Sequence, residues 1–119
     1  MTMFRFRLRR SRVEFLANKE LARSLVNAKI EHFNQTYGFM VKRVSIRNQR
    51  SRWGSCSKKG NLNFNYRLVL LPPLVADYII VHELCHLGEF NHSKKFWALV
   101  AKAIPNHKQL KKDLRGRVI

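Results

Sequence analysis

The hydrophobic and polar positions at the start of this chain alternate one by one. Apolar residues and arginines follow each other in the order Phe4, Arg5, Phe6, Arg7, Leu8 and Arg9. A period of two is typical of a strand with one apolar and one charged face, and charge protects a free strand edge. We therefore expect residues 1–18 to form a basic edge strand or arm. A solvated face needs no partner, although arginines in such a row could also grip phosphate groups.

A helical period follows Asn18. Apolar residues then recur every three or four positions, at Ala22, Val26, Ile30, Phe33 and Tyr37. Asn18 is a suitable helix N-cap, and Gly38 is a suitable stop. The pattern predicts a helix over residues 19–37.

Two strands are expected within residues 40–71. The apolar positions of the first are Met40, Val44 and Ile46, and those of the second are Leu62, Phe64, Tyr66, Leu68 and Leu70. Residues 50–61 contain Gly54 and Gly60, which are typical of a connection between strands.

Helices are expected in the rest of the chain. Pro73 can occupy the first turn of a helix over residues 73–87, and Gly88 can end it in the left-handed conformation. Residues 93–115 should form further helices, divided at Pro105. The expected buried stripe of the first of these is Phe96, Trp97, Val100 and Ile104.

The helix over residues 73–87 carries a pattern with chemical content. His82 and His86 lie one helical turn apart, so both imidazoles can reach one ion. Glu83 flanks the pair. This spacing is the signature of zinc proteases, in which two histidines bind zinc and the glutamate takes a proton from the metal-bound water. The alternative is that these are ordinary side chains of an amphipathic helix.

A catalytic zinc ion takes three protein ligands and keeps one position open, so a third ligand is needed. The downstream candidates are Glu89, His92, His107 and Asp113. His92 is the best of them, because a turn at Gly88 lets the chain bring it back to the metal. The expected first shell is therefore His82, His86, His92 and water.

Charge adds a second hypothesis. The formal net charge is +17, and residues 1–60 carry 15 basic and 3 acidic side chains. Such an excess attracts polyanions, so nucleic-acid contact through the N-terminal half must be considered. A nucleic-acid-associated protein with structural zinc, closed by four protein ligands, is the alternative to a hydrolase.

The remaining composition sets bounds. A chain of 119 residues fits one domain over residues 1–119. The longest apolar run, residues 68–81, is shorter than the ~20 residues that span a bilayer, and no signal peptide is recognisable. We expect a cytoplasmic protein without membrane contact, whose Cys56 and Cys85 stay reduced.

Two stretches together resemble a known family. They are Arg52-Trp53-Gly54-Ser55-Cys56-Ser57 and His82-Glu83-Leu84-Cys85-His86-Leu87, completed by Asn91-His92-Ser93 and Phe96-Trp97. The combination is similar to the YgjP-like zinc metallopeptidase domains over residues 44–105. The position of the last histidine also resembles SprT-like and WLM-type proteases, which act on proteins crosslinked to DNA.

The resemblance implies a zincin-like α+β domain. A small, mainly antiparallel sheet would pack on the N-terminal helix and the active-site helix, with further C-terminal helices. It implies a peptidase with His82, His86 and His92 as zinc ligands and Glu83 as catalytic acid and base, acting on peptide or protein substrates.

Other residues in these stretches have open roles. Arg52 and Trp53 could shape a substrate cleft, but such residues beside a glycine turn more often pack a hairpin. Cys56 could approach the metal as a thiolate, although a buried thiol is more common. Cys85 points away from the ligand face. Tyr78 lies one turn before His82 and could polarise a carbonyl, but it is expected to pack its helix.

Overall fold

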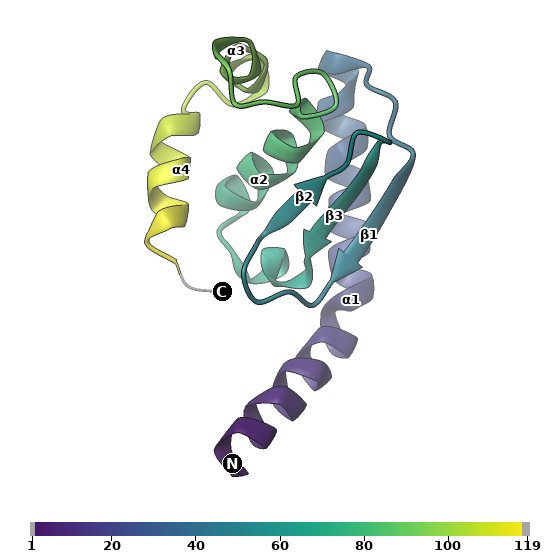
Figure 1. The fold of residues 1–119 in the computed structure, drawn as a ribbon, viewed down its shortest axis with the longest axis vertical. Coiled ribbons are helices and arrows are strands. Elements are labelled where there is room, and N and C mark those ends of the chain that lie inside the picture. The colour runs from purple at the N-terminus through teal and green to yellow at the C-terminus, as the bar shows by residue number, and fades with distance from the viewer. Residues whose placement is uncertain (1, 118–119) are drawn as a thin grey trace.

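The computed structural model describes residues 2–117, with side chains from Ser11 onward (Figure 1). In chain order the elements are α1 (Thr2–Tyr37), β1 (Arg43–Arg47), β2 (Gly54–Cys56), β3 (Asn61–Asn65), the 3-10 helix η1 (Tyr66–Leu70), α2 (Pro73–Cys85), α3 (Lys94–Ala103) and α4 (His107–Arg115). The expected α+β class is confirmed. Helix α2 lies at the centre and contacts α1, α3, α4, η1, β2 and β3.

Helix α1 begins at Thr2, so the strand expected within residues 1–18 is wrong. Asn18 is not an N-cap but lies inside the helix, where its Nδ2 donates to the carbonyl of Glu14 at 2.8 Å. Residues 2–18 contain neither glycine nor proline, and extending a helix that packing has already fixed costs little. The N-terminal end projects beyond the rest of the molecule in Figure 1.

The second half of α1 behaves as its period predicts. Ala22, Val26 and Ile30 are buried against the core. Gly38 ends the helix with a φ of +72°, which only glycine adopts readily. This half of α1 therefore forms one wall of the domain.

The sheet is mixed rather than mainly antiparallel. Its strand order is β1-β3-β2, with β1 parallel and β2 antiparallel to β3. The chain leaves β1, passes beyond the position of β3 to form the edge strand β2, and returns through a turn into the central place. β2 lies in the segment that was expected to be only a connection between strands. Its three residues begin with glycine and show no alternation of apolar and polar positions, so the pattern did not predict a strand there.

Asn65 explains why the second strand stops early. The expected strand continued to Leu70, but the side chain of Asn65 accepts a hydrogen bond from the backbone N–H of Arg67 at 3.1 Å and starts a 3-10 turn. Its Nδ2 donates to the carbonyls of Gln49 (2.7 Å) and Arg52 (3.1 Å). This fully buried side chain thus ties the loop before β2 to the end of β3.

Helix α2 is shorter than the expected residues 73–87 and is enclosed almost all round. From Val75 to Cys85 every residue except His82 is buried. Asp77 is buried with its Oδ1 3.3 Å from Nζ of Lys29, so this charge is paired. Although α2 is apolar, no helix within residues 2–117 combines the length and the hydrophobicity needed to cross a membrane.

Gly88 does not adopt the expected left-handed conformation. Glycine is needed at this position for a steric reason, because a Cβ there would lie 2.5 Å from Cζ of Phe39. Phe39 cannot move away easily. Its ring stacks on Tyr37, and its backbone exchanges two hydrogen bonds with the side chain of Asn34, at 2.8 and 2.7 Å.

We expect Gly88→Ala to lower the free energy of unfolding by about 1–3 kcal/mol, because the new methyl group overpacks the contact with Phe39. The matched control is Gly116→Ala, where the nearest atom to a new Cβ is 3.5 Å away. It should change stability by less than about 0.5 kcal/mol. Urea unfolding followed by circular dichroism measures both, and equal values would contradict the role given to Phe39.

Candidate metal centre

The end of α2 presents two of the predicted ligands. The ring centroids of His82 and His86 lie 4.8 Å apart, one helical turn from each other. The side chain of His82 is 20% exposed, in a helix whose other residues from Val75 to Cys85 are buried. The helix therefore opens to the surface at the position where the spacing places the metal.

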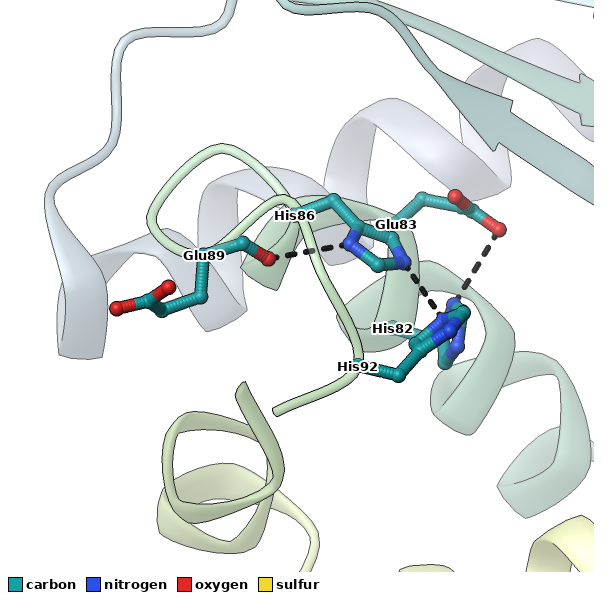
Figure 2. A network of polar contacts seen from close by, with 5 residues as sticks. All are labelled: His82, Glu83, His86, Glu89 and His92. Atoms are coloured by element: carbon teal, nitrogen blue, oxygen red, sulfur yellow. Dashed lines mark hydrogen bonds and ion pairs between the residues drawn. The ribbon is translucent and has the colours of Figure 1, made fainter. Parts of the chain in front are cut away.

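The third predicted ligand joins this pair. After α2 the chain turns back over residues 86–92, and Ser93 caps α3 by accepting a hydrogen bond from the N–H of Phe96 at 3.3 Å. His92 directly precedes this cap, with its Nε2 3.1 Å from Nε2 of His86. Each of the three histidines contributes one ring nitrogen, and these three atoms, from His82, His86 and His92, lie within 4.8 Å of one another (Figure 2).

A backbone contact fixes the tautomer of His86. Its Nδ1 lies 3.2 Å from the carbonyl oxygen of Glu89, which can only accept, so Nδ1–H is the donor (Figure 2). In the neutral ring Nε2 then carries a lone pair, and this atom faces His92. A carbonyl partner on the distal nitrogen is the usual support of a metal-binding histidine.

The ring of Phe96 packs against all three imidazoles. Its side chain is fully buried and stacks on His86 with centroids 4.3 Å apart and planes 21° apart. Its edge contacts to the rings of His82 and His92 have centroid distances of 5.0 and 5.1 Å. One rigid ring therefore positions all three histidines.

The surroundings favour the neutral form of His86 and of His92. Burial and the neighbouring His82 lower the pKa of His86 below its ordinary value. Burial, the other two histidines and Lys111 likewise lower the pKa of His92. Neutral imidazole is the form that binds a metal ion, so the unprotonated lone pairs are available near neutral pH.

Glu83 lies between the histidines and the sheet. It is 8% exposed, and its Oε2 is 3.4 Å from Nδ1 of His82. A Cβ on Gly54 would lie 3.0 Å from Cγ of Glu83, so the edge strand β2 passes directly against this carboxylate. From the sequence, Gly54 is only a turn residue. A glycine within a strand often marks a point where another part of the chain approaches closely. The interpretation of Gly54 as a turn residue missed this signal.

A hollow of about 130 Å³ opens beside Glu83. Its lining residues are Trp53, Gly54, Tyr78, Ile79, His82, Glu83 and Leu114. Trp53 thus lines this space, and so does Tyr78. Burial and the charge of Glu83 raise the pKa of Tyr78 to about 12, so its hydroxyl stays protonated.

The other candidate ligands lie elsewhere. Glu89 contributes its backbone carbonyl rather than its carboxylate, His107 stacks on Trp97, and Asp113 pairs with Arg117 at 3.2 Å. Within residues 2–117, the group that can hold a metal consists of the three histidines named above. Arg52 contributes its carbonyl to the anchor at Asn65.

Neither cysteine belongs to that group. Cys85 is fully buried and Cys56 partly so, and both thiols are free. Burial and then the charge of Glu83 raise the pKa of Cys56 to about 11. A raised pKa of this kind is typical of a buried thiol, the more common of the two roles considered for Cys56.

A helix-borne histidine pair with an adjacent glutamate and a third histidine beyond a turn is the arrangement of HExxH metallopeptidases. The sequence model of the YgjP-like, metallopeptidase domain family matches residues 8–117, so the chain belongs to this family. The resemblance seen in the sequence is thereby confirmed, and the chain is a metallopeptidase domain. A search of curated proteins found no match.

Solved structures support the same fold. The metallopeptidase zymogen abylysin of Pyrococcus abyssi is similar at 27% identity and a TM-score of 0.68, over 75% of this chain and 90% of that one. The metallopeptidase zymogen jannalysin of Methanocaldococcus jannaschii shares the fold at 21% identity and a TM-score of 0.63, over 80% and 94%.

We expect Phe96→Leu to weaken zinc binding about tenfold, because the three imidazoles lose their common support. The control is Val100→Ala, which also removes buried volume from α3 but is one helical turn away. It should leave the zinc dissociation constant within about twofold of the wild-type value. Competition with a chelator measures both constants, and an unchanged constant in Phe96→Leu would show that the ring does not position the ligands.

Proposed function

We propose that this chain is a zinc-dependent peptidase in which His82, His86 and His92 hold the ion and Glu83 is the general base. The observation that supports this most directly is the meeting of three imidazole nitrogens beside a buried carboxylate. Three nitrogen ligands with a fourth position left open suit catalytic zinc. When bound, zinc polarises the scissile carbonyl and lowers the pKa of water.

Glu83 is suited to move the proton. In the described part of the chain its Oε2 lies 3.4 Å from Nδ1 of His82, and none of the salt bridges to lysine or arginine involves this carboxylate. A carboxylate without a permanent cationic partner can accept a proton from the attacking water and pass it to the leaving amine. Its burial against Gly54 holds it in one place between transfers.

The edge strand β2 offers a way to hold the substrate backbone. In the order β1-β3-β2 one edge of β2 has no neighbouring strand, and this strand passes Glu83. An extended peptide can add to such an edge through main-chain hydrogen bonds. Its scissile bond would then lie between β2 and the histidines.

The structural-zinc alternative has less support. It requires four protein ligands, whereas three side chains form the group within residues 2–117. Membership of a metallopeptidase family also favours proteins or peptides as substrates. Contact with nucleic acid through the basic N-terminal half stays a prediction.

Glu83→Gln should bind about one zinc ion per chain, as the wild type does, and lose hydrolysis of an unstructured protein by at least about a hundredfold. The amide keeps the shape of the carboxylate but cannot accept the proton. Metal analysis together with a cleavage assay on the zinc-loaded proteins tests this. Cleavage at the wild-type rate would disprove the assigned role.

Gly54→Ala should separate metal binding from catalysis. The new methyl group would lie 3.0 Å from Cγ of Glu83 and 3.1 Å from the carbonyl oxygen of Asn63, so the carboxylate must shift. A displacement of this size is expected to lower kcat about 10- to 100-fold. Zinc affinity should stay within about threefold, because the atoms nearest to the new methyl group belong to Glu83 and Asn63 rather than to a histidine. A normal kcat would mean that β2 does not position Glu83.

A further inference from the structure

A second, larger pocket lies between α3 and α4. Its volume is about 510 Å³, and its lining residues are Lys94, Trp97, Ala98, His107, Lys108 and Lys111. It is distinct from the hollow beside Glu83, with which it shares no lining residue. Nothing in the proposed hydrolysis uses it.

The pocket has an aromatic wall with a polar atom that lacks a partner. Trp97 stacks on His107 with centroids 5.2 Å and planes 17° apart. His107 is 9% exposed, and its Nδ1 is buried without a hydrogen-bond partner among the described residues. Buried polar atoms are normally satisfied, so this nitrogen makes the wall more polar than its aromatic rings alone would.

The charge around this wall is of one sign. Lys94, Lys108 and Lys111 line the pocket together with no acidic residue, and within residues 2–117 none of the three forms an ion pair. The Nζ of Lys111 lies 4.7 Å from the centroid of Trp97. Burial, together with Lys108 and Lys111, lowers the pKa of His107, as a positive local potential does.

Trp97 also connects the pocket to the metal centre. Its ring stacks on His92 at a centroid distance of 6.0 Å and lies equally far from the ring of His82. One residue of an extended peptide spans about 3.3–3.6 Å. A side chain one to three positions from a bond held at the histidines can therefore enter this pocket.

We propose that the pocket between α3 and α4 is a specificity site that binds a carboxylate of the peptide substrate close to the scissile bond. This inference rests on the proposed peptidase function. The carboxylate can belong to an aspartate or glutamate side chain or to the C-terminus of the peptide. An acidic peptide fits better than a nucleic acid, because the pocket adjoins the proposed site of peptide hydrolysis through Trp97.

The test measures binding without hydrolysis. Zinc-loaded Glu83→Gln is titrated by calorimetry with blocked peptides that differ only by glutamate or glutamine at each of three positions on either side of a central bond. A third peptide set has glutamine throughout and a free C-terminal carboxylate. We expect one of the two carboxylate sets to bind about five- to tenfold more tightly than the blocked glutamine peptide.

Lysine variants in the same background locate the effect. Lys111→Gln should reduce the preference to below about twofold, whereas Lys112→Gln should leave it intact. Lys112 is the matched control, because it is an exposed lysine on the same helix outside the pocket. Equal binding of charged and neutral peptides, or a preference that survives Lys111→Gln, would overturn the proposal. So would binding of a short single-stranded oligonucleotide that depends on Lys111 when no acidic peptide binds.

Kinetics separates this inference from the proposed function. With wild-type zinc enzyme, the preferred peptide should have a kcat/KM about five- to tenfold higher, mainly through KM, and Lys111→Gln should remove that difference. If the wild type cleaves both peptides equally well, the peptidase stands and the specificity site fails. If the calorimetric preference depends on Lys111 but no peptide is cleaved, the carboxylate site stands and the peptidase proposal fails.

Discussion

Burial of α2 by the surrounding elements is the constraint on which the rest of the structure depends. A helix with hydrophobic residues on every side has to be enclosed, and here α1, the sheet, α3 and α4 cover it. The enclosure leaves His82 uncovered at the point where His86 ends the helix. The side chains of His82 and His86 are therefore attached to a helix backbone that close packing holds in place.

The same packing sets the position of parts that are distant in sequence. α3 lies on α2 through Phe96, whose ring touches all three histidines. β2 lies on α2 through Gly54, where the absence of a side chain lets the strand reach Glu83. The three histidines and the carboxylate are therefore held by contacts between separate elements rather than by the helix alone.

Sequence reasoning succeeded where the signal is local. The spacing of His82 and His86 on a helix, and the return of the chain to His92, follow from helix geometry and a short turn. The start of α3 and the break between α3 and α4 follow from Ser93 and Pro105. These features depend on residues only a few positions apart, so the sequence contains them in readable form.

It failed where distant contacts decide. The arginine alternation before Asn18 satisfies a strand pattern, yet no strand of the described sheet comes from that segment, and the packed helix simply continues through it. The place of β2 and the parallel pairing of β1 with β3 depend on anchors such as Asn65, whose partners lie 13 and 16 residues away. The spacing of apolar and polar residues does not predict which distant residues become hydrogen-bond partners.

The two tryptophans of the chain both stand beside the candidate metal centre, Trp53 in the hollow next to Glu83 and Trp97 against His92. The tryptophan fluorescence of the protein therefore originates beside the site rather than being averaged over the fold. An unfolding curve followed by emission reports the region around α2, β2 and α3, while circular dichroism is dominated by the long α1. Any difference between the two curves would measure how far the site opens before the fold is lost.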